Sequence, residues 1–258
     1  MARTQASRTI AEGAAIRLWK RYGFRTVADL ELEVLALARG VVVLEGRLDT
    51  ADARLVRKGN AGLLRVNQAI REPGRKRFAI AHELGHFEIH ADQTQLSACS
   101  SQDMIADYKG SMPEVEANWF AAELLMPRHL FAAQLGNAFP SFSVVRALAS
   151  SFGTTVTATA LRMVELSDDY CALVVSEGGR IGWWRANGGF RERYWLKSGG
   201  ELSERSAAGA VFYGDSPDGE PVRISAVAWG GPEIETDWWE DVCVIDSYGQ
   251  ILSLIRAG

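Results

Sequence analysis

The sequence lacks the features that mark several common protein classes. No apolar run approaches about 18 residues, the length from which a transmembrane helix is read, so no membrane span is expected. The first eight residues do not contain the apolar core of a signal peptide. No internal repeat or low-complexity tract interrupts the chain. These absences predict a globular protein of the cytoplasm.

Cysteine is scarce, and the chain has no excess of positive charge. The three cysteines, Cys99, Cys171 and Cys243, are odd in number and far apart, which favours reduced cytosolic thiols over a disulfide framework. The formal net charge of −4 provides no general basic field for binding nucleic acid. A chain of 258 residues, 47% of them hydrophobic, can bury the core of one large domain or of several small ones.

Histidine is also scarce, yet three of the 4 histidines, His82, His86 and His90, are clustered. His82 and Glu83 begin a His-Glu-x-x-His motif that ends at His86. On a helix, His82 and His86 share one face at the spacing with which two imidazoles bind one zinc ion. Glu83 is placed to act on a water rather than to bind the metal. The neighbouring residues are mostly apolar, so the imidazoles are buried and need partners, which disfavours a pair of surface histidines.

Three other polar residues near the motif are harder to assign. His90 lies about 12 Å along the helix from His82, too far to share one ion, and is expected to be a polar residue at the helix end. Tyr108, in a polar loop, is a candidate donor to the transition state. His129 is another candidate, although a surface histidine is the preferred interpretation.

A catalytic zinc site needs a third protein ligand and an open position. Residues 113–127 predict a helix, with a proline at each end and acids near its start. Glu114 and Asn118 are four residues apart on one face, which suits a carboxylate ligand and an amide that hydrogen-bonds a metal-bound histidine. Glu116 points about 200° away from Glu114 and is the alternative ligand.

Two segments resemble the ImmA/IrrE family of metallo-endopeptidases: the motif at 77–87 and the Glu-x-Glu-Ala-Asn helix at 114–127. The resemblance is best over residues 35–165 and implies a gluzincin-like site with two histidines and a glutamate. It favours Glu114 as the third ligand, with Asn118 replacing the aspartate of the broader Glu-x-x-x-Asp pattern. It also implies a protease that cleaves a helix-turn-helix (XRE-like) repressor and so derepresses stress-response or mobile-element genes.

The elements before the motif read as scaffold. Ser7 can cap a helix that ends near residue 22, and a second helix is predicted at 27–38. A short buried strand and a hairpin across Gly59 and Asn60 are expected next, at 41–44, 53–57 and 63–67. The strand at 64–67 is a candidate edge to which a substrate peptide could add, with an ordinary core strand as the alternative.

Residues 142–151 and 154–166 predict a helix-turn-helix with its turn at Phe152 and Gly153. Arg146 and Arg162 are its few candidates for base reading, so a packing module is preferred to a DNA-binding one. Beyond residue 167, short apolar stretches separated by Gly, Asp or Ser predict strands. The expected strands are 170–175, 181–185, 191–196, 209–213, 222–229, 233–239, 241–247 and 251–255.

We therefore predict an α+β protein in three parts. A zincin-like, mainly helical metallopeptidase domain with a small sheet is expected at 1–138. A helix-turn-helix-like segment follows at 139–167, and a mostly β domain, a GAF-like sensor or a protein-interaction module, is expected at 168–258.

The predicted site comprises the general base Glu83 and the metal ligands His82, His86 and Glu114, with Asn118 holding a ligand in place. The predicted cofactor is Zn²⁺, with Mn²⁺ as the alternative ion. The alternative function is a non-catalytic regulatory or toxin-like protein that binds an antitoxin repressor or DNA.

Overall fold

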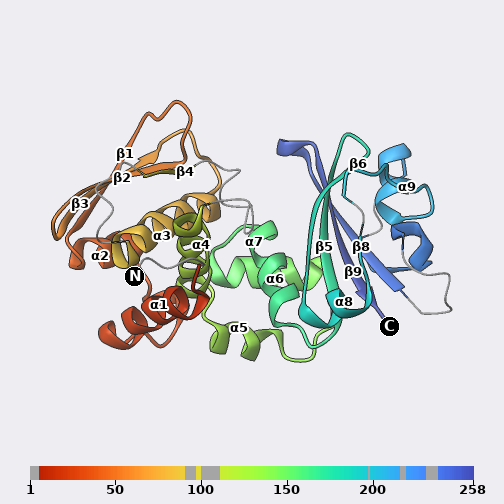
Figure 1. Cartoon of the computed structure of the whole chain (residues 1–258), viewed down its shortest axis with the longest axis horizontal. Coiled ribbons are helices and arrows are strands. Elements are labelled where there is room, and N and C mark those ends of the chain that lie inside the picture. Colours follow the sequence, from red (N-terminus) through yellow and green to blue (C-terminus); the bar gives the residue numbers. More distant parts are fainter. Residues whose placement is uncertain (1–5, 91–96, 100–110, 197, 216–218, 231–237) are drawn as a thin grey trace. The chain divides into compact units, whose positions relative to one another are not determined.

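The structure is a computed structural model that describes residues 6–90, 97–99, 111–196, 198–215, 219–230 and 238–258. The chain forms two compact units, the first comprising Met1–Phe131 with Ser150–Thr155 and the second Ala132–Ala149 with Val156–Gly258. Helices and two sheets occur in the described residues, which agrees with the predicted α+β class (Figure 1). No helix among these residues has both the length and the apolar character that a membrane span requires.

The first unit begins with helix α1 (Arg8–Tyr22), which Ser7 caps as expected by accepting a hydrogen bond from the Ile10 N–H. The helix predicted at 27–38 is instead broken into the 3-10 turn η1 (Val27–Asp29) and helix α2 (Leu32–Ala38). The break has a local cause, because the Asp29 carboxylate accepts hydrogen bonds from the backbone N–H groups of Arg25 and Thr26. These bonds close the short turn before a longer helix can form.

The sheet of the first unit has the strand order β1-β3-β2-β4. Its strands are β1 (Val41–Gly46), β2 (Ala53–Lys58), β3 (Ala61–Asn67) and β4 (Ser97–Cys99). Strands β2 and β3 form the predicted antiparallel hairpin, and Gly59 in its turn has a φ of 59° that favours glycine.

Two expectations about this sheet are wrong. Strand β3 lies between β1 and β2, so residues 64–67 belong to an interior strand and not to an edge. Strand β1 is not fully buried, since the side chains of Val42 and Leu44 are 44% and 48% exposed. The reason is the alternation of a strand that packs on one face only: Val41, at the start of β1, is buried while Val42 and Leu44 face outward.

Helix α3 (Pro73–Ile89) packs between this sheet and helix α4 (Met112–Leu125), as Figure 1 shows. A Cβ atom on Gly85 of α3 would lie 3.0 Å from the Phe120 ring and 3.2 Å from the Ala117 Cα of α4. The absence of a side chain at position 85 therefore lets the two helices approach closely. Helix α5 (Arg128–Leu135) follows α4 after a turn at Pro127.

Helices α6 (Phe142–Phe152) and α7 (Val156–Leu166) occupy the two stretches predicted to be helical, with a left-handed turn at Gly153 between them. The antiparallel sheet of the second unit has the order β6-β5-β9-β8-β7. Its strands are β5 (Tyr170–Glu177), β6 (Arg180–Ala186), β7 (Val222–Ile224), β8 (Trp238–Ile245) and β9 (Gln250–Ala257). The predicted strand at 233–239 falls largely outside the described residues, which resume at Trp238.

Two predicted strands of the second unit, 191–196 and 209–213, are wrong because these segments contribute to helices α8 (Gly188–Arg193) and α9 (Ala207–Tyr213). Asn187 caps α8 by accepting from the Phe190 N–H, and Ser206 caps α9 by accepting from the Gly209 N–H. The segment 222–229 is divided between β7 and the 3-10 turn η2 (Ala226–Trp229).

Candidate metal centre

Helix α3 brings His82 and His86 to one face, one turn apart. Both side chains are buried, and their Nε2 atoms lie 3.1 Å from each other. The helical repeat alone produces this pairing, because residues four apart lie above one another. The packing of α3 against the sheet and α4 then keeps both imidazoles away from water.

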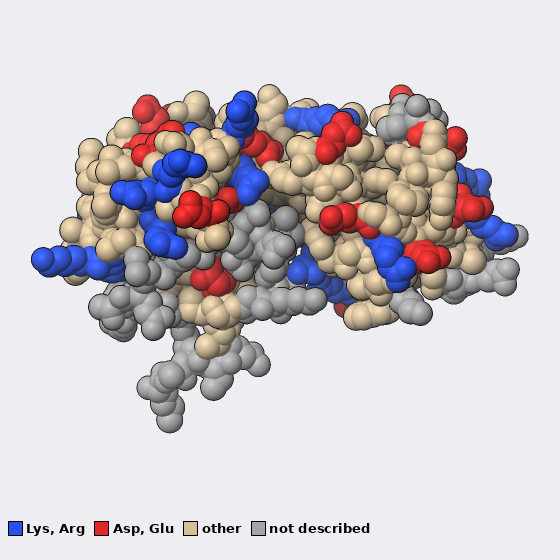
Figure 2. All heavy atoms as spheres, turned by 90° about the horizontal axis from the view of Figure 1, so that it is seen from above, with Lys and Arg blue, Asp and Glu red and all other residues tan. Residues whose placement is uncertain are grey.

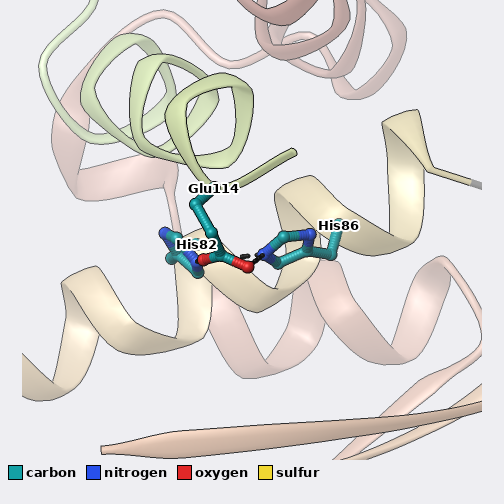
Figure 3. A group of neighbouring side chains, drawn as sticks. All are labelled: His82, His86 and Glu114. Atoms are coloured by element: carbon teal, nitrogen blue, oxygen red, sulfur yellow. Dashed lines mark hydrogen bonds and ion pairs between the residues drawn. The ribbon is translucent and has the colours of Figure 1, made fainter. Parts of the chain in front are cut away.

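Helix α4 supplies a carboxylate to the same point, from Glu114 in its first turn (Figure 3). Glu114 Oε2 lies 3.0 Å from His82 Nε2, and Oε1 lies 3.4 Å from His86 Nε2. Burial acts to raise the pKa of Glu114, but the close contacts of its carboxylate with the rings of His82 and His86 outweigh it, so the pKa is held well below its ordinary value. Among the described residues, these three side chains form the group that can hold a metal ion.

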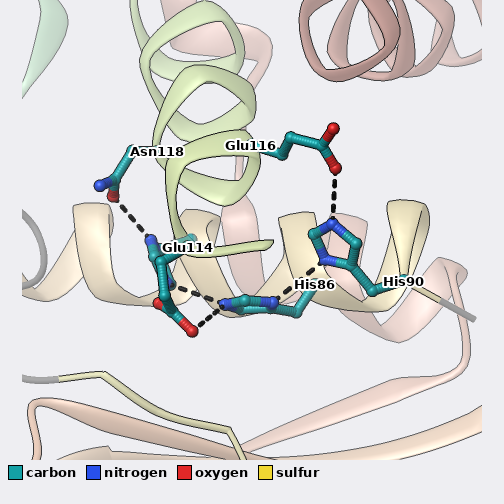
Figure 4. Close-up of polar contacts among 6 residues, drawn as sticks. His86, His90, Glu114, Glu116 and Asn118 are labelled. Carbon is teal, nitrogen blue, oxygen red and sulfur yellow. Dashed lines mark hydrogen bonds and ion pairs between the residues drawn. The ribbon is translucent and has the colours of Figure 1, made fainter. Parts of the chain in front are cut away.

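The outer nitrogen of each histidine has a partner of its own (Figure 4). His82 Nδ1 lies 2.8 Å from Asn118 Oδ1, and His86 Nδ1 lies 3.1 Å from His90 Nδ1. An amide oxygen only accepts, so His82 Nδ1 carries a proton, and in the neutral ring Nε2 keeps its lone pair. This is the tautomer in which Nε2 can bind a metal.

The spacing of the three donors fits a small cation. Ligands about 2.0–2.1 Å from a tetrahedral zinc ion lie about 3.3 Å from one another. Here the two Nε2 atoms lie 3.1 Å apart, Glu114 Oε2 lies 3.0 Å from His82 Nε2, and Glu114 Oε1 lies 3.4 Å from His86 Nε2. Two imidazoles and one carboxylate are also the donor set of catalytic zinc sites that keep a fourth position open.

Glu83 follows His82 directly on α3 and is fully buried. It is not one of the three side chains whose donor atoms converge. A carboxylate next to a candidate ligand is a candidate for proton transfer.

The structure gives Glu116 a different environment from Glu114. Its Oε2 lies 2.9 Å from His90 Nε2, and its Oε1 accepts a hydrogen bond from the Ser7 N–H at 2.7 Å. Glu116 is outside the group of converging donors. Glu114 thus faces His82 and His86, whereas Glu116 faces His90.

His90 ends α3, but it is buried and bonded on both ring nitrogens instead of being a simple polar end. The sequence contained a signal for this, because His90 is four residues after His86 and therefore above it on the helix. His129 is exposed, with its ring edge-on to that of Trp19. Tyr108, the other candidate donor, lies outside the described residues.

Comparisons with known proteins bear on the family and on the fold. The family model of peptidase M78, the IrrE N-terminal-like domain, matches residues 36–164, which is half of the chain. A search of curated proteins found no match. A solved structure of a Mycobacterium tuberculosis transcriptional regulator is 20% identical, with a TM-score of 0.59, over 96% of this chain and 87% of the other. That likeness shows the fold alone. The family match covers both helices that carry the candidate ligands, and the chain therefore belongs to the ImmA/IrrE family, peptidase M78.

Proposed function

We propose that the protein is a zinc-dependent endopeptidase with a gluzincin-like site. The observation that carries the proposal is the convergence of His82 Nε2, His86 Nε2 and the Glu114 carboxylate on one point. Three acceptors have little reason to share a buried point unless a cation joins them. Zinc suits two imidazoles and a carboxylate, and manganese is the alternative ion.

A bound zinc ion supplies Lewis-acid chemistry, polarising the scissile carbonyl and lowering the pKa of a water at the open position. Glu83 takes the proton from the attacking water as the new bond to the carbonyl carbon forms. It then delivers that proton to the leaving amine as the peptide bond breaks. Asn118 holds the His82 ring by accepting from Nδ1–H, so the ligand keeps one orientation through the cycle.

We further propose a regulatory role, in which the substrate is a helix-turn-helix (XRE-like) repressor in the cytoplasm. Cleavage would derepress stress-response or mobile-element genes. Membership in the ImmA/IrrE family supports a protein substrate, and the similar fold of a transcriptional regulator supports a place in gene control. The proposed peptidase domain is 1–138, followed by a helix-turn-helix-like segment at 139–167 and a sensor or protein-interaction domain at 168–258.

DNA binding through α6 and α7 has less support. Arg162 is 2% exposed and pairs with Glu165, while the Arg146 guanidinium contacts Cys243 Sγ at 3.2 Å. Arg162 is thus not presented as a base-reading side chain, and the exposed Arg146 is engaged by Cys243 of the same unit. Figure 2 shows one face of the molecule, on which the described Lys and Arg side chains are interspersed with Asp and Glu.

The proposal is tested by incubating zinc-loaded protein with the helix-turn-helix repressor encoded nearest to its gene and reading intact masses. The wild type is expected to cut once, whereas Glu83→Gln should bind one zinc and cut at least about 100-fold more slowly, since it cannot accept a proton. Glu123→Gln is the matched control, because Glu123 is a buried glutamate of α4 that accepts from the Arg128 N–H outside the site. It should cut like the wild type.

Cleavage by Glu83→Gln at the wild-type rate would remove Glu83 from the mechanism. A tight complex that neither protein cuts would favour the non-catalytic binding function instead.

A further inference from the structure

A chain of polar contacts continues from His86 away from the metal centre, through His90 to Glu116 (Figure 4). His86 Nδ1 lies 3.1 Å from His90 Nδ1, and His90 Nε2 lies 2.9 Å from Glu116 Oε2. Glu116 is 2% exposed and His90 is 9% exposed. Burying a carboxylate and an imidazole costs free energy unless each is bonded, so this pair has a structural or functional reason to be there.

The direction of each hydrogen bond follows from the chemistry of the carboxylate. Glu116 is an acceptor when ionised, so a neutral His90 donates to it from Nε2–H. His90 Nδ1 is then left with its lone pair and accepts from His86 Nδ1–H. His86 Nε2 in turn keeps its lone pair on the side that faces His82 and Glu114.

We propose that Glu116 and His90 are positioning residues, which hold His86 in its metal-binding tautomer and thereby set the metal affinity of the site. This inference rests on the metal site of the proposed function. It gives His86 a support that parallels the one Asn118 provides for His82, with an imidazole and a carboxylate in place of an amide.

The N-terminal helix takes part in this arrangement. Glu116 Oε1 accepts from the Ser7 N–H at 2.7 Å, immediately before α1. One oxygen of the carboxylate is therefore fixed by the backbone and the other faces His90. The orientation of Glu116 depends on the docking of α1 against α4, two helices that pack together in the first unit.

The first test measures zinc affinity by competition with a chelator of known affinity. His90→Leu removes the acceptor for His86 Nδ1–H and should weaken zinc binding by about 10–100-fold. His90→Asn restores an acceptor close to the position of Nδ1 and should stay within about fivefold of the wild type, because only the tautomer of His86 needs to be held. Glu123→Ala, which removes a buried carboxylate of α4 elsewhere, should leave zinc affinity unchanged.

The second test asks whether Glu116 acts through His90. Glu116→Ala should weaken zinc binding in the wild-type background and have no further effect when His90 is already leucine. Additive losses in the double variant would show that Glu116 acts by another route, and the proposal would be wrong.

The third measurement needs no variant to fold. Nitrogen NMR of the histidine rings in the metal-free wild type near pH 8 should show His86 and His90 protonated on Nδ1 and Nε2, respectively. A proton on His86 Nε2 would overturn the proposal. If the wild type binds no zinc, the proposed function itself fails. If the wild type binds zinc and a folded His90→Leu variant binds it equally tightly, only the proposed positioning role fails.

Discussion

At the scale of single residues, the candidate site depends on which atom of each side chain carries a proton. His82 and His86 are both histidines of helix α3, yet their Nδ1 atoms have different partners. That of His82 contacts the amide of Asn118, and that of His86 contacts the imidazole of His90. Glu114 and Glu116 differ in the same way, since one faces the two ligand nitrogens and the other faces His90. Residue type and position in the sequence therefore do not assign these roles; the partner of each atom does.

A residue-scale prediction concerns Cys171, which lies at the start of β5 and is fully buried. Burial raises the pKa of its thiol to about 12 from a usual 9.0, and the charge of Asp169 adds to the effect. Because the folded pKa lies above the unfolded one, the stability contributed by the neutral thiol is complete below pH 9.0 and is lost as the pH rises toward about 12.

Urea unfolding between pH 8 and 10.5 measures this loss. The wild type should lose about 2 kcal/mol more of its free energy of unfolding over that interval than Cys171→Ala, which has no thiol to ionise. Equal losses in the two proteins would contradict the assigned pKa.

At the scale of elements, the distance between α3 and α4 determines whether the third ligand reaches the histidines. Gly85→Ala would place a methyl group 3.0 Å from the Phe120 ring and 3.2 Å from the Ala117 Cα. The helices must then separate, which moves Glu114 away from His82 and His86. Such overpacking costs about 1–3 kcal/mol, against about 1 kcal/mol gained because alanine favours a helix over glycine.

We expect Gly85→Ala to bind zinc at least about tenfold more weakly, as measured by chelator competition. Gly13→Ala in α1 is the control, since a Cβ there meets only the end of the Arg17 side chain at 3.4 Å. That variant should gain up to about 1 kcal/mol of stability and keep its zinc affinity. Tight zinc binding by Gly85→Ala would show that the helices can adjust without moving the ligand.

Helix α9 shows why a local pattern can assign the wrong element. Apolar residues at 209–213 predicted a strand, but Ser206 caps a helix there, and the buried carboxylate of Glu240 accepts from the N–H groups of Ala207 and Ala208. Glu240 is on β8, far along the chain. A carboxylate at a helix N-terminus stabilises it by satisfying free N–H groups, and a local window of sequence does not contain this contact.

At the scale of the whole molecule, metal binding should contribute to the stability of the folded chain. All three proposed ligands belong to the first unit, on helices that pack together. A ligand at about 100 times its Kd stabilises the folded state by about 2.7 kcal/mol, because the unfolded chain does not assemble the site.

Removing the metal with a chelator should therefore lower the melting temperature by roughly 5–10 °C in differential scanning calorimetry. Added zinc should restore it in the wild type but not in His86→Ala. Restoration in His86→Ala would indicate that zinc stabilises the protein at some other place.

The sequence by itself placed the proposed metal-binding pair and the proposed general base together, because His82, Glu83 and His86 lie within about one helical turn and α-helix geometry is local. It also determined the family, since two motifs at a fixed separation are specific. Tertiary structure decided which glutamate faces those histidines, that His90 and Glu116 support His86, and that β3 is an interior strand. Each of these depends on how separate elements pack, and packing joins residues that sequence spacing keeps apart.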